Sequence, residues 1–121
     1  MKSDNVIQQK SFEFAIKIIN LYKYLKDEKK EFVLSKQVLK SGTSLGANIE
    51  EGIGGQSKAD FLSKLSIAYK EARETVYWLK LLFETDFIKK EDYGNLFSDA
   101  EEICKIIGKI QITIKTQLNR N

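Results

Sequence analysis

Residues 41–52 read Ser41-Gly-Thr-Ser-Leu-Gly-Ala-Asn-Ile-Glu-Glu-Gly52, a stretch that combines three glycines with a row of small side chains. Apolar and small positions recur through it at helical spacing, in the order Leu34, Val38, Gly42, Leu45, Ile49 and Ile53. The stretch is therefore predicted to lie inside a helix. Glycine is a poor helix residue, so two glycines one turn apart in mid-helix predict the close approach of another backbone.

The same stretch matches the G-x-S-x-G nucleophile elbow of serine hydrolases at Gly42 to Gly46, with Ser44 in the place of the nucleophile. That motif needs a strand-to-helix turn and a basic partner, and the chain contains no histidine. Lys40 lies one helical turn from Ser44, but nothing in the sequence indicates the burial that would let it act as a base. We predict no catalytic residue and expect that the protein is not an enzyme.

Composition favours one helical domain over residues 1–121. The chain has 42% hydrophobic and 31% charged residues and no proline, which suits long helices. A single cysteine, no signal-peptide pattern and no apolar run of about 18 residues lead us to expect a cytoplasmic protein without membrane contact. Without histidine, metal binding would depend on carboxylates, and the pairs Glu50-Glu51 and Glu101-Glu102 point in different directions on a helix. No metal and no cofactor are predicted.

Four helices are expected, at residues 8–26, 34–52, 58–85 and 90–118. Ser35 is the expected cap of the second helix, and Ser57 with Asp60 resembles a capping box at the start of the third. The glycines that follow residue 52 are expected to end the second helix with a positive φ.

The first and third helices carry more apolar surface than a single bundle face needs. The first has two stripes, one of Phe12, Ala15, Ile16, Ile19 and Tyr22, the other of Phe14, Ile18, Leu21 and Leu25. The third has one face of Phe61, Leu65, Ala68, Ala72, Val76, Leu79 and Phe83, and a smaller one of Ile67, Trp78, Leu81 and Leu82. The small residues of the second helix predict a close contact that can lie within one bundle or with another subunit. The wide apolar coverage of the first helix and the smaller face of the third favour another subunit.

The residues assigned to this contact belong to the second and third helices. They are Ser41, Gly42, Ser44, Gly46, Ala47, Asn48, Glu51, Ile67, Glu71, Arg73, Glu74 and Trp78. Five of them, Asn48, Glu51, Glu71, Arg73 and Glu74, could form a polar network there, since a buried charge needs a partner.

The fourth helix separates its charges. Its expected core face includes Cys104 among the apolar residues from Tyr93 to Leu118, and its acidic residues lie in its first half. Its second half carries Lys105, Lys109, Lys115 and Arg120 without an acid among them. This order complements the helix macrodipole, and it is also what a surface that contacts nucleic acid would need.

The motif at 41–52, followed by Asp60-Phe61, Lys64-Leu65, Ile67-Ala68, Lys70 to Thr75 and Tyr77-Trp78-Leu79, resembles the four helix bundle proteins encoded in intervening sequences of bacterial 23S ribosomal RNA genes. The resemblance covers nearly the whole chain. It implies an antiparallel, up-and-down bundle, commonly a ring-shaped homopentamer, with no enzymatic activity.

A related branch, the accessory variability determinant of diversity-generating retroelements, is a basic pentamer that binds nucleic acid and associates with a reverse transcriptase. The present chain has a net charge of only +3. The resemblance points to Arg73, with Glu74 and Asn48 beside it, as a structural or binding position. We therefore predict a homopentameric scaffold that binds RNA or a nucleic-acid-processing protein, and the alternative is a protein–protein adaptor without nucleic-acid binding.

Overall fold

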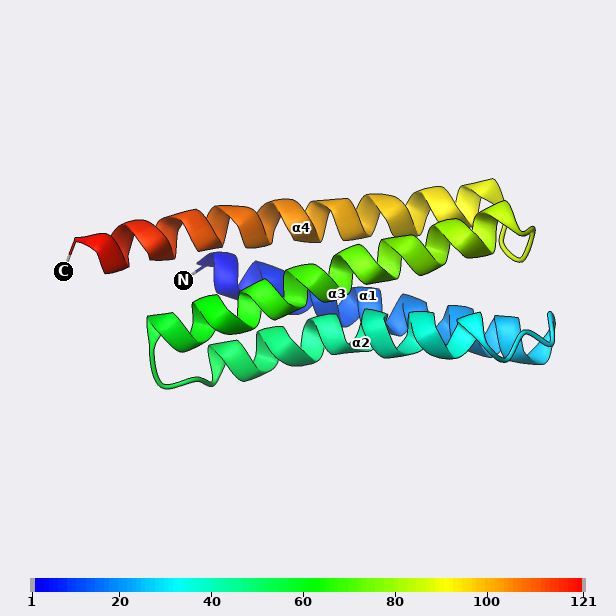
Figure 1. Cartoon of the computed structure of the whole chain (residues 1–121), viewed down its shortest axis with the longest axis horizontal. Helices are drawn as coiled ribbons and strands as arrows, with labels where there is room; N and C mark the ends of the chain where they lie inside the picture. Colours follow the sequence, from blue (N-terminus) through cyan, green and yellow to red (C-terminus); the bar gives the residue numbers. More distant parts are fainter. Residues whose placement is uncertain (1, 121) are drawn as a thin grey trace.

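Four helices form an elongated bundle in the computed structural model of the chain, which describes residues 2–120 and side chains from Asn5 onward (Figure 1). They are α1 (Lys2–Asp27), α2 (Leu34–Ile53), α3 (Lys58–Glu84) and α4 (Lys90–Asn119), and no strand occurs within residues 2–120. The neighbouring pairs are α1–α2, α2–α3, α3–α4 and α4–α1, so that α2 and α4 lie on opposite corners. The predicted all-α fold of four helices is confirmed, and its connectivity is up-and-down.

The first helix begins at Lys2, earlier than the predicted residue 8. Ile7 explains the difference, because it is fully buried one heptad before the buried Phe14. The helix must already be formed at Ile7 to bring both side chains to the same face.

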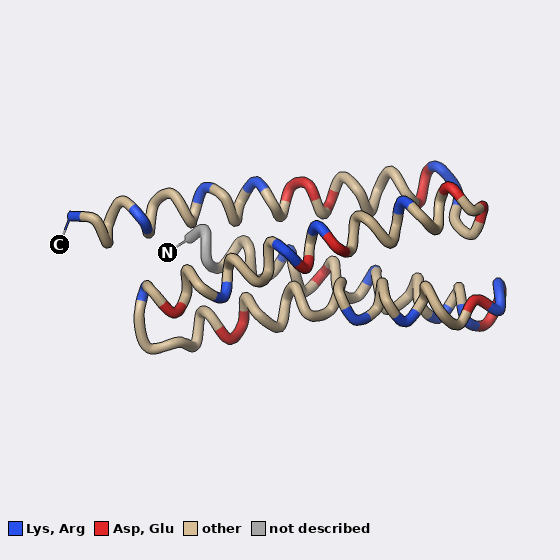
Figure 2. The backbone as a smooth tube through the Cα atoms, in the orientation of Figure 1, with Lys and Arg blue, Asp and Glu red and all other residues tan. Residues whose placement is uncertain are grey.

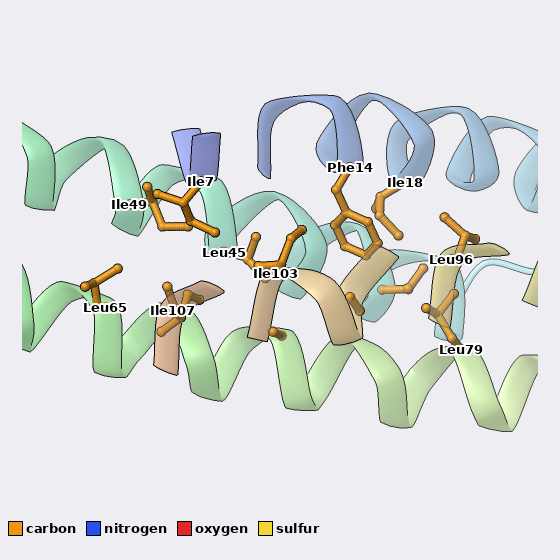
Figure 3. Packing of buried hydrophobic residues seen from close by; sticks show 14 of the residues in the cluster. Ile7, Phe14, Ile18, Leu45, Ile49, Leu65, Leu79, Leu96, Ile103 and Ile107 are labelled. Atoms are coloured by element: carbon orange, nitrogen blue, oxygen red, sulfur yellow. The ribbon is translucent and has the colours of Figure 1, made fainter. Parts of the chain in front are cut away.

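Core positions in every helix are spaced alternately by three and four residues. The buried residues with this spacing are Ile7, Ser11, Phe14, Ile18 and, after a step of seven residues, Leu25 in α1; Ser35, Val38, Gly42, Leu45, Ile49 and Gly52 in α2; Phe61, Leu65, Ala68, Ala72, Thr75, Leu79 and Leu82 in α3; and Leu96, Ala100, Ile103, Ile107, Ile110 and Ile114 in α4. Ser41 of α2 is also buried, beside Gly42. This spacing of 3.5 residues is that of helices packed at a small angle, as in coiled coils and four-helix bundles. Figure 3 shows the side chains of all four helices meeting along the bundle axis.

The 3.5-residue spacing corrects several predicted positions. In α2 the core includes Ser35 and Gly52 in place of Leu34 and Ile53, and in α3 it includes Thr75 and Leu82 in place of Val76 and Phe83. Leu82 therefore belongs to the core and not to the smaller face of α3. The predictions followed runs of four residues, which drift around the helix, whereas the helices keep the a/d pattern.

Gly42 and Gly46 lie against α1 of the same chain. A methyl group built on Gly42 would be 2.8 Å from both branches of Ile18, and one on Gly46 would be 3.4 Å from the carbonyl oxygen of Ser11. This answers the question left open by the sequence, because the close contact is within the bundle. Only glycine at position 42 lets α1 and α2 approach this closely.

The helix ends follow the predictions in part. Ser57 Oγ accepts a hydrogen bond from Asp60 N at 3.1 Å, as predicted. Ser35 does not cap α2; the carboxylate of Glu31 accepts from Val33 N at 3.1 Å and Ser35 N at 2.8 Å. Gly54, after α2, has a φ of −81°, because its N–H closes an ordinary last turn onto Glu50 O. The positive φ angles fall instead in the other two connections, at Lys30 and Asp86.

Replacement of Gly42 by alanine is expected to destabilise the bundle by about 1–3 kcal/mol, because the added methyl overlaps Ile18. Gly108→Ala is the matched control: a methyl group there has no neighbour within 4 Å, so better helix propensity should stabilise the chain by up to about 1 kcal/mol. Urea unfolding measures both values. Equal effects of the two substitutions would contradict the packing role of Gly42.

Candidate functional site

The predicted contact residues of α2 point to three different sides of the helix. Gly42 and Gly46 face α1, whereas Ser41 is buried against α3. Ala47 is exposed, and the half-buried Asn48 donates from Nδ2 to the carbonyl oxygen of Ser44 at 2.8 Å. Ser44 lies in the middle of a continuous helix and not on a strand-to-helix turn, which is the geometry that the nucleophile elbow requires.

A buried hydroxyl pair joins α2 to α3. Thr75 Oγ1 donates to Ser41 Oγ at 2.9 Å, and both residues are almost completely buried. Each hydroxyl also lies near a carbonyl oxygen one turn earlier, Glu71 O at 2.7 Å from Thr75 and Gln37 O at 3.2 Å from Ser41. Two polar groups can therefore occupy core positions without losing their hydrogen bonds. Thr75 was not predicted; the signal that could have found it is the 3.5-residue repeat.

The five polar residues predicted to form a network instead make separate contacts. Glu51 pairs with Lys64 at 2.9 Å, and Glu74 accepts from Trp78 Nε1 at 3.1 Å. Burial raises the pKa of Glu71, the charge of Glu74 adds to this effect, and Lys40 opposes it. None of the five bonds to another through its side chain in the described chain. These five side chains lie at different heights along α2 and α3, so no single contact between the two helices brings all of them together.

Arg73 and Cys104 lie where α3 meets α4. The Arg73 side chain is exposed, and Cys104 is half-buried. Burial raises the pKa of the Cys104 thiol, with a further increase from Glu101, while the charge of Arg73 acts in the opposite direction. The thiol is thus kept protonated and packs as a small apolar side chain.

One apolar stripe of α1 remains uncovered. Phe12 is 66% exposed, Ile16 46% and Ile19 37%, whereas the parallel stripe through Phe14 and Ile18 is buried. Phe12 also lines a shallow hollow of about 220 Å³ between α1 and α2, whose floor includes Ser11 and Gly46. We name Phe12, Ile16 and Ile19 the α1 stripe. The sequence shows both stripes as apolar, but it does not show which of the two is the core.

The outer side of α3 is less apolar than predicted. Ile67 is exposed, Trp78 and Leu81 are half-buried, and Tyr77 is exposed beside Trp78, with its ring edge-on at 5.1 Å between centroids. The Trp78 indole bonds to Glu74 on the same helix. Ile67, Trp78 and Leu81 therefore form a small, partly exposed apolar surface that is interspersed with acidic residues.

Lys105, Lys109, Lys115 and Arg120 are all exposed on α4. Figure 2 shows that acidic residues dominate the first half of this helix and basic residues its second half. The end of α4 extends beyond the N-terminal end of α1 and the α2–α3 connection (Figure 1), whereas Ile114, one residue before Lys115, is still buried in the bundle. Lys105, Lys109 and Lys115 therefore lie beside the bundle, and Arg120 directly follows the last residue of α4, Asn119.

A hollow of about 520 Å³ lies between α1 and α4. Leu21, Ile88 and Leu96 line its apolar part, and Asn20 and Asn95 are among its polar residues. Two ion pairs join the helices along this seam, Lys17 to Asp99 at 2.7 Å and Lys10 to Glu102 at 2.7 Å.

The described residues offer no other chemical centre. No group of three or more His, Cys, Asp or Glu side chains is placed to hold a metal ion within the part of the chain that the structure describes. None of its four helices combines the length and the apolar character needed to cross a bilayer.

Comparison with known proteins agrees with the fold. The family model described as 23S rRNA-intervening sequence protein matches residues 3–109, a range that ends before the projecting turns of α4. A crystal structure from Bacteroides thetaiotaomicron, of a protein with unknown function from the S23 ribosomal protein family, is 55% identical. The match covers 93% of this chain and 98% of the Bacteroides chain, with a TM-score of 0.88. No curated protein matches the chain.

The buried hydroxyl pair gives a testable coupling. Thr75→Val should cost about 1 kcal/mol, because Ser41 loses a hydrogen-bond partner in the core. In a double-mutant cycle with Ser41→Ala, we expect a coupling free energy of at least about 0.5 kcal/mol in denaturant unfolding. Thr113→Val is the control, because the exposed hydroxyl of Thr113 donates to Lys109 O on its own helix. This substitution should show no coupling to Ser41→Ala. Additive effects of Thr75→Val and Ser41→Ala would show that the pair does not link α2 to α3.

Proposed function

This chain belongs to the 23S rRNA-intervening sequence protein family, and we propose that it is a non-enzymatic scaffold, a ring of five helical bundles that binds RNA or an enzyme acting on nucleic acid. The observation that carries the proposal is the exposed α1 stripe. The absence of histidine and the mid-helix position of Ser44 support a role without catalysis.

Self-association follows from the cost of leaving the α1 stripe in water. Phe12, Ile16 and Ile19 are neighbours on one flank of α1, and full burial of a side chain of this size contributes about 1.5–3 kcal/mol. Gly46 and Ala47 have no bulky side chains, so little projects from the adjoining surface of α2. The side chains of a second copy can therefore reach the hollow beside Phe12. A second copy of the chain is a partner that is present wherever the protein is made.

RNA binding is assigned to the C-terminal end of α4. Lys115 is exposed directly after Ile114, the last buried residue of α4, and Arg120 is exposed at the end of the helix, where a phosphate backbone can approach from several directions. Five copies in a ring would present five such ends together, and multivalent contact raises the effective affinity of each weak site. Because the family match stops at residue 109, we propose that this contact belongs to this chain and not to the whole family.

Phe12→Lys with Ile16→Glu should convert the assembly to monomer. The substitutions put two opposite charges on the α1 stripe without changing the net charge, and burial of those charges between copies would be unfavourable. Sedimentation velocity at micromolar concentration measures the result, with circular dichroism to show that the variant is folded.

Val33→Lys is the control for this variant, because Val33 is 70% exposed in the α1–α2 connection, away from the stripe. It should leave the assembly unchanged. A wild-type chain that sediments as a monomer would overturn self-association, and an intact assembly of the Phe12→Lys, Ile16→Glu variant would exclude the α1 stripe as its contact.

Lys115→Gln with Arg120→Gln should weaken the binding of structured RNA at low salt. If each cation neutralises one phosphate, the slope of log affinity against log salt should become shallower by about two. Filter retention over a salt series measures both quantities. The matched control is Lys29→Gln with Lys30→Gln, two exposed lysines of the α1–α2 connection, which should leave the slope unchanged.

RNA binding that is equally weak in the wild type and the variant would contradict this part of the proposal. Capture of one protein that survives nuclease and high salt, without RNA retention, would show that the chain is an adaptor instead.

A further inference from the structure

The helices α2 and α4 carry their charges in opposite order. Along α2, Lys36 and Lys40 come first and Glu50 and Glu51 come last. Along α4, the exposed acids Glu91 and Asp92 lie in the first turn beside one exposed lysine, Lys90, and the lysines Lys105 and Lys109 follow in the second half. All of these residues are exposed, and Figure 2 shows the change of sign along α4.

The order along α2 opposes its own helix dipole. A helix N-terminus carries a partial positive charge and favours acids, yet Lys36 lies in the first turn of α2 and Glu50 and Glu51 lie in the last. The charges of α4 follow the favourable order, so the macrodipole accounts for α4 but not for α2. Within the described chain, Glu50 accepts from Gln8 at 2.7 Å and Glu51 pairs with Lys64 at 2.9 Å, whereas the Lys36 side chain has no hydrogen bond or ion pair.

Contacts through α1 show which charges lie at the same height along the bundle. Gly42 of α2 packs on Ile18, and the neighbouring Lys17 pairs with Asp99 of α4, so residues 42 and 99 are level. Since α2 and α4 run in the same direction, Lys36 is level with the first turns of α4. Glu50, bonded to Gln8, is level with the region of α4 just beyond Glu102, which pairs with Lys10.

The opposite charges at each height cannot meet inside one molecule. The helices α2 and α4 occupy opposite corners, and their exposed sides face away from each other. They meet if a second copy stands beside the first with its axis parallel. Lys36 then faces the acidic first turns of the neighbouring α4, and Glu50 faces its lysines.

We propose that neighbouring copies stand side by side with parallel axes, with the α1–α2 face of one copy against α4 of the next. We call this contact head to tail because it joins two different surfaces, and the two opposite charge orders set its orientation. The inference rests on the self-association proposed above and identifies the partner surface. Phe12 and Glu50 line the same hollow, and Lys36 lies about four helical turns before Glu50 on the same side of α2, so the α1 stripe and these two charges belong to one face. On α4, the exposed Phe97 and Ile112 supply apolar surface to cover it.

A head-to-tail contact repeats from copy to copy and forms a ring when the rotation between copies closes, whereas a two-fold contact stops at a dimer. Two α4 helices packed antiparallel around a two-fold axis would also match acid to lysine. That arrangement leaves the α1 stripe exposed and Lys36 without a partner, so the head-to-tail arrangement accounts for more of the surface.

The test exchanges charges while the net charge stays the same. The α2 exchange is Lys36→Glu with Glu50→Lys, and the α4 exchange is Glu91→Lys with Lys105→Glu. At low salt, we expect either exchange alone to weaken self-association at least about tenfold in sedimentation equilibrium, because like charges then face each other at both heights. Both exchanges in one chain should return the affinity to within about threefold of wild type, and all differences should shrink in high salt.

The α2 exchange should not destabilise the helix. It places an acid in the first turn of α2 and a lysine in the last, which is the order that the helix dipole favours. Thermal unfolding should therefore show a folded variant, and lost association cannot be attributed to lost structure. Unchanged association of the α2 exchange, while Phe12→Lys with Ile16→Glu disrupts it, would overturn the head-to-tail orientation and leave self-association intact. Failure of the combined exchange to restore association would also overturn it, and a monomeric wild type would remove the self-association on which it rests.

Discussion

The close approach of α1 and α2 at Gly42 and Ile18 is the constraint on which the rest of the structure depends. No side chain fits between the two helices at this point, because even a methyl group would lie 2.8 Å from Ile18. The contact orients α1 so that Phe14 and Ile18 enter the core. The flank with Phe12, Ile16 and Ile19 then necessarily points outward, so one close packing contact creates both the core and the exposed stripe.

The bundle has more apolar surface than four helices can bury with a 3.5-residue repeat. Each helix contributes one narrow a/d stripe to the core, and side chains outside that stripe remain in water unless another molecule covers them. Small residues make the adjoining surface of α2 low, and polar core residues such as Ser41 and Thr75 satisfy each other. These features suit a subunit whose outer faces are made for contact, and the charge orders of α2 and α4 indicate how such contacts would be oriented.

Much of the fold could be predicted from the sequence. Periodicity located four helices, Ser57 marked the start of α3, and the motifs of α2 and α3 identified the family that the family match then confirmed. The candidate site could be predicted only in part. Gly42 and Gly46 were recognised as close-contact positions, but the partner helix was not, and within the described chain the polar side chains from Asn48 to Glu74 bond to other residues and not to one another. A sequence gives the angle of each residue around its own helix, but not the neighbour that it meets.

The sequence by itself determined the helices, the lack of a histidine base and the separation of charge along α4, because these depend on residue identity and local spacing. Only the tertiary structure decided which stripe of α1 is buried, that Thr75 and Leu82 belong to the core, and which charges of α2 and α4 share a height. Those features depend on how helices rotate and shift against one another when they pack. The rotation is set by side-chain volumes on several helices at once, Gly42 and Ile18 above all, and no single helix carries that information.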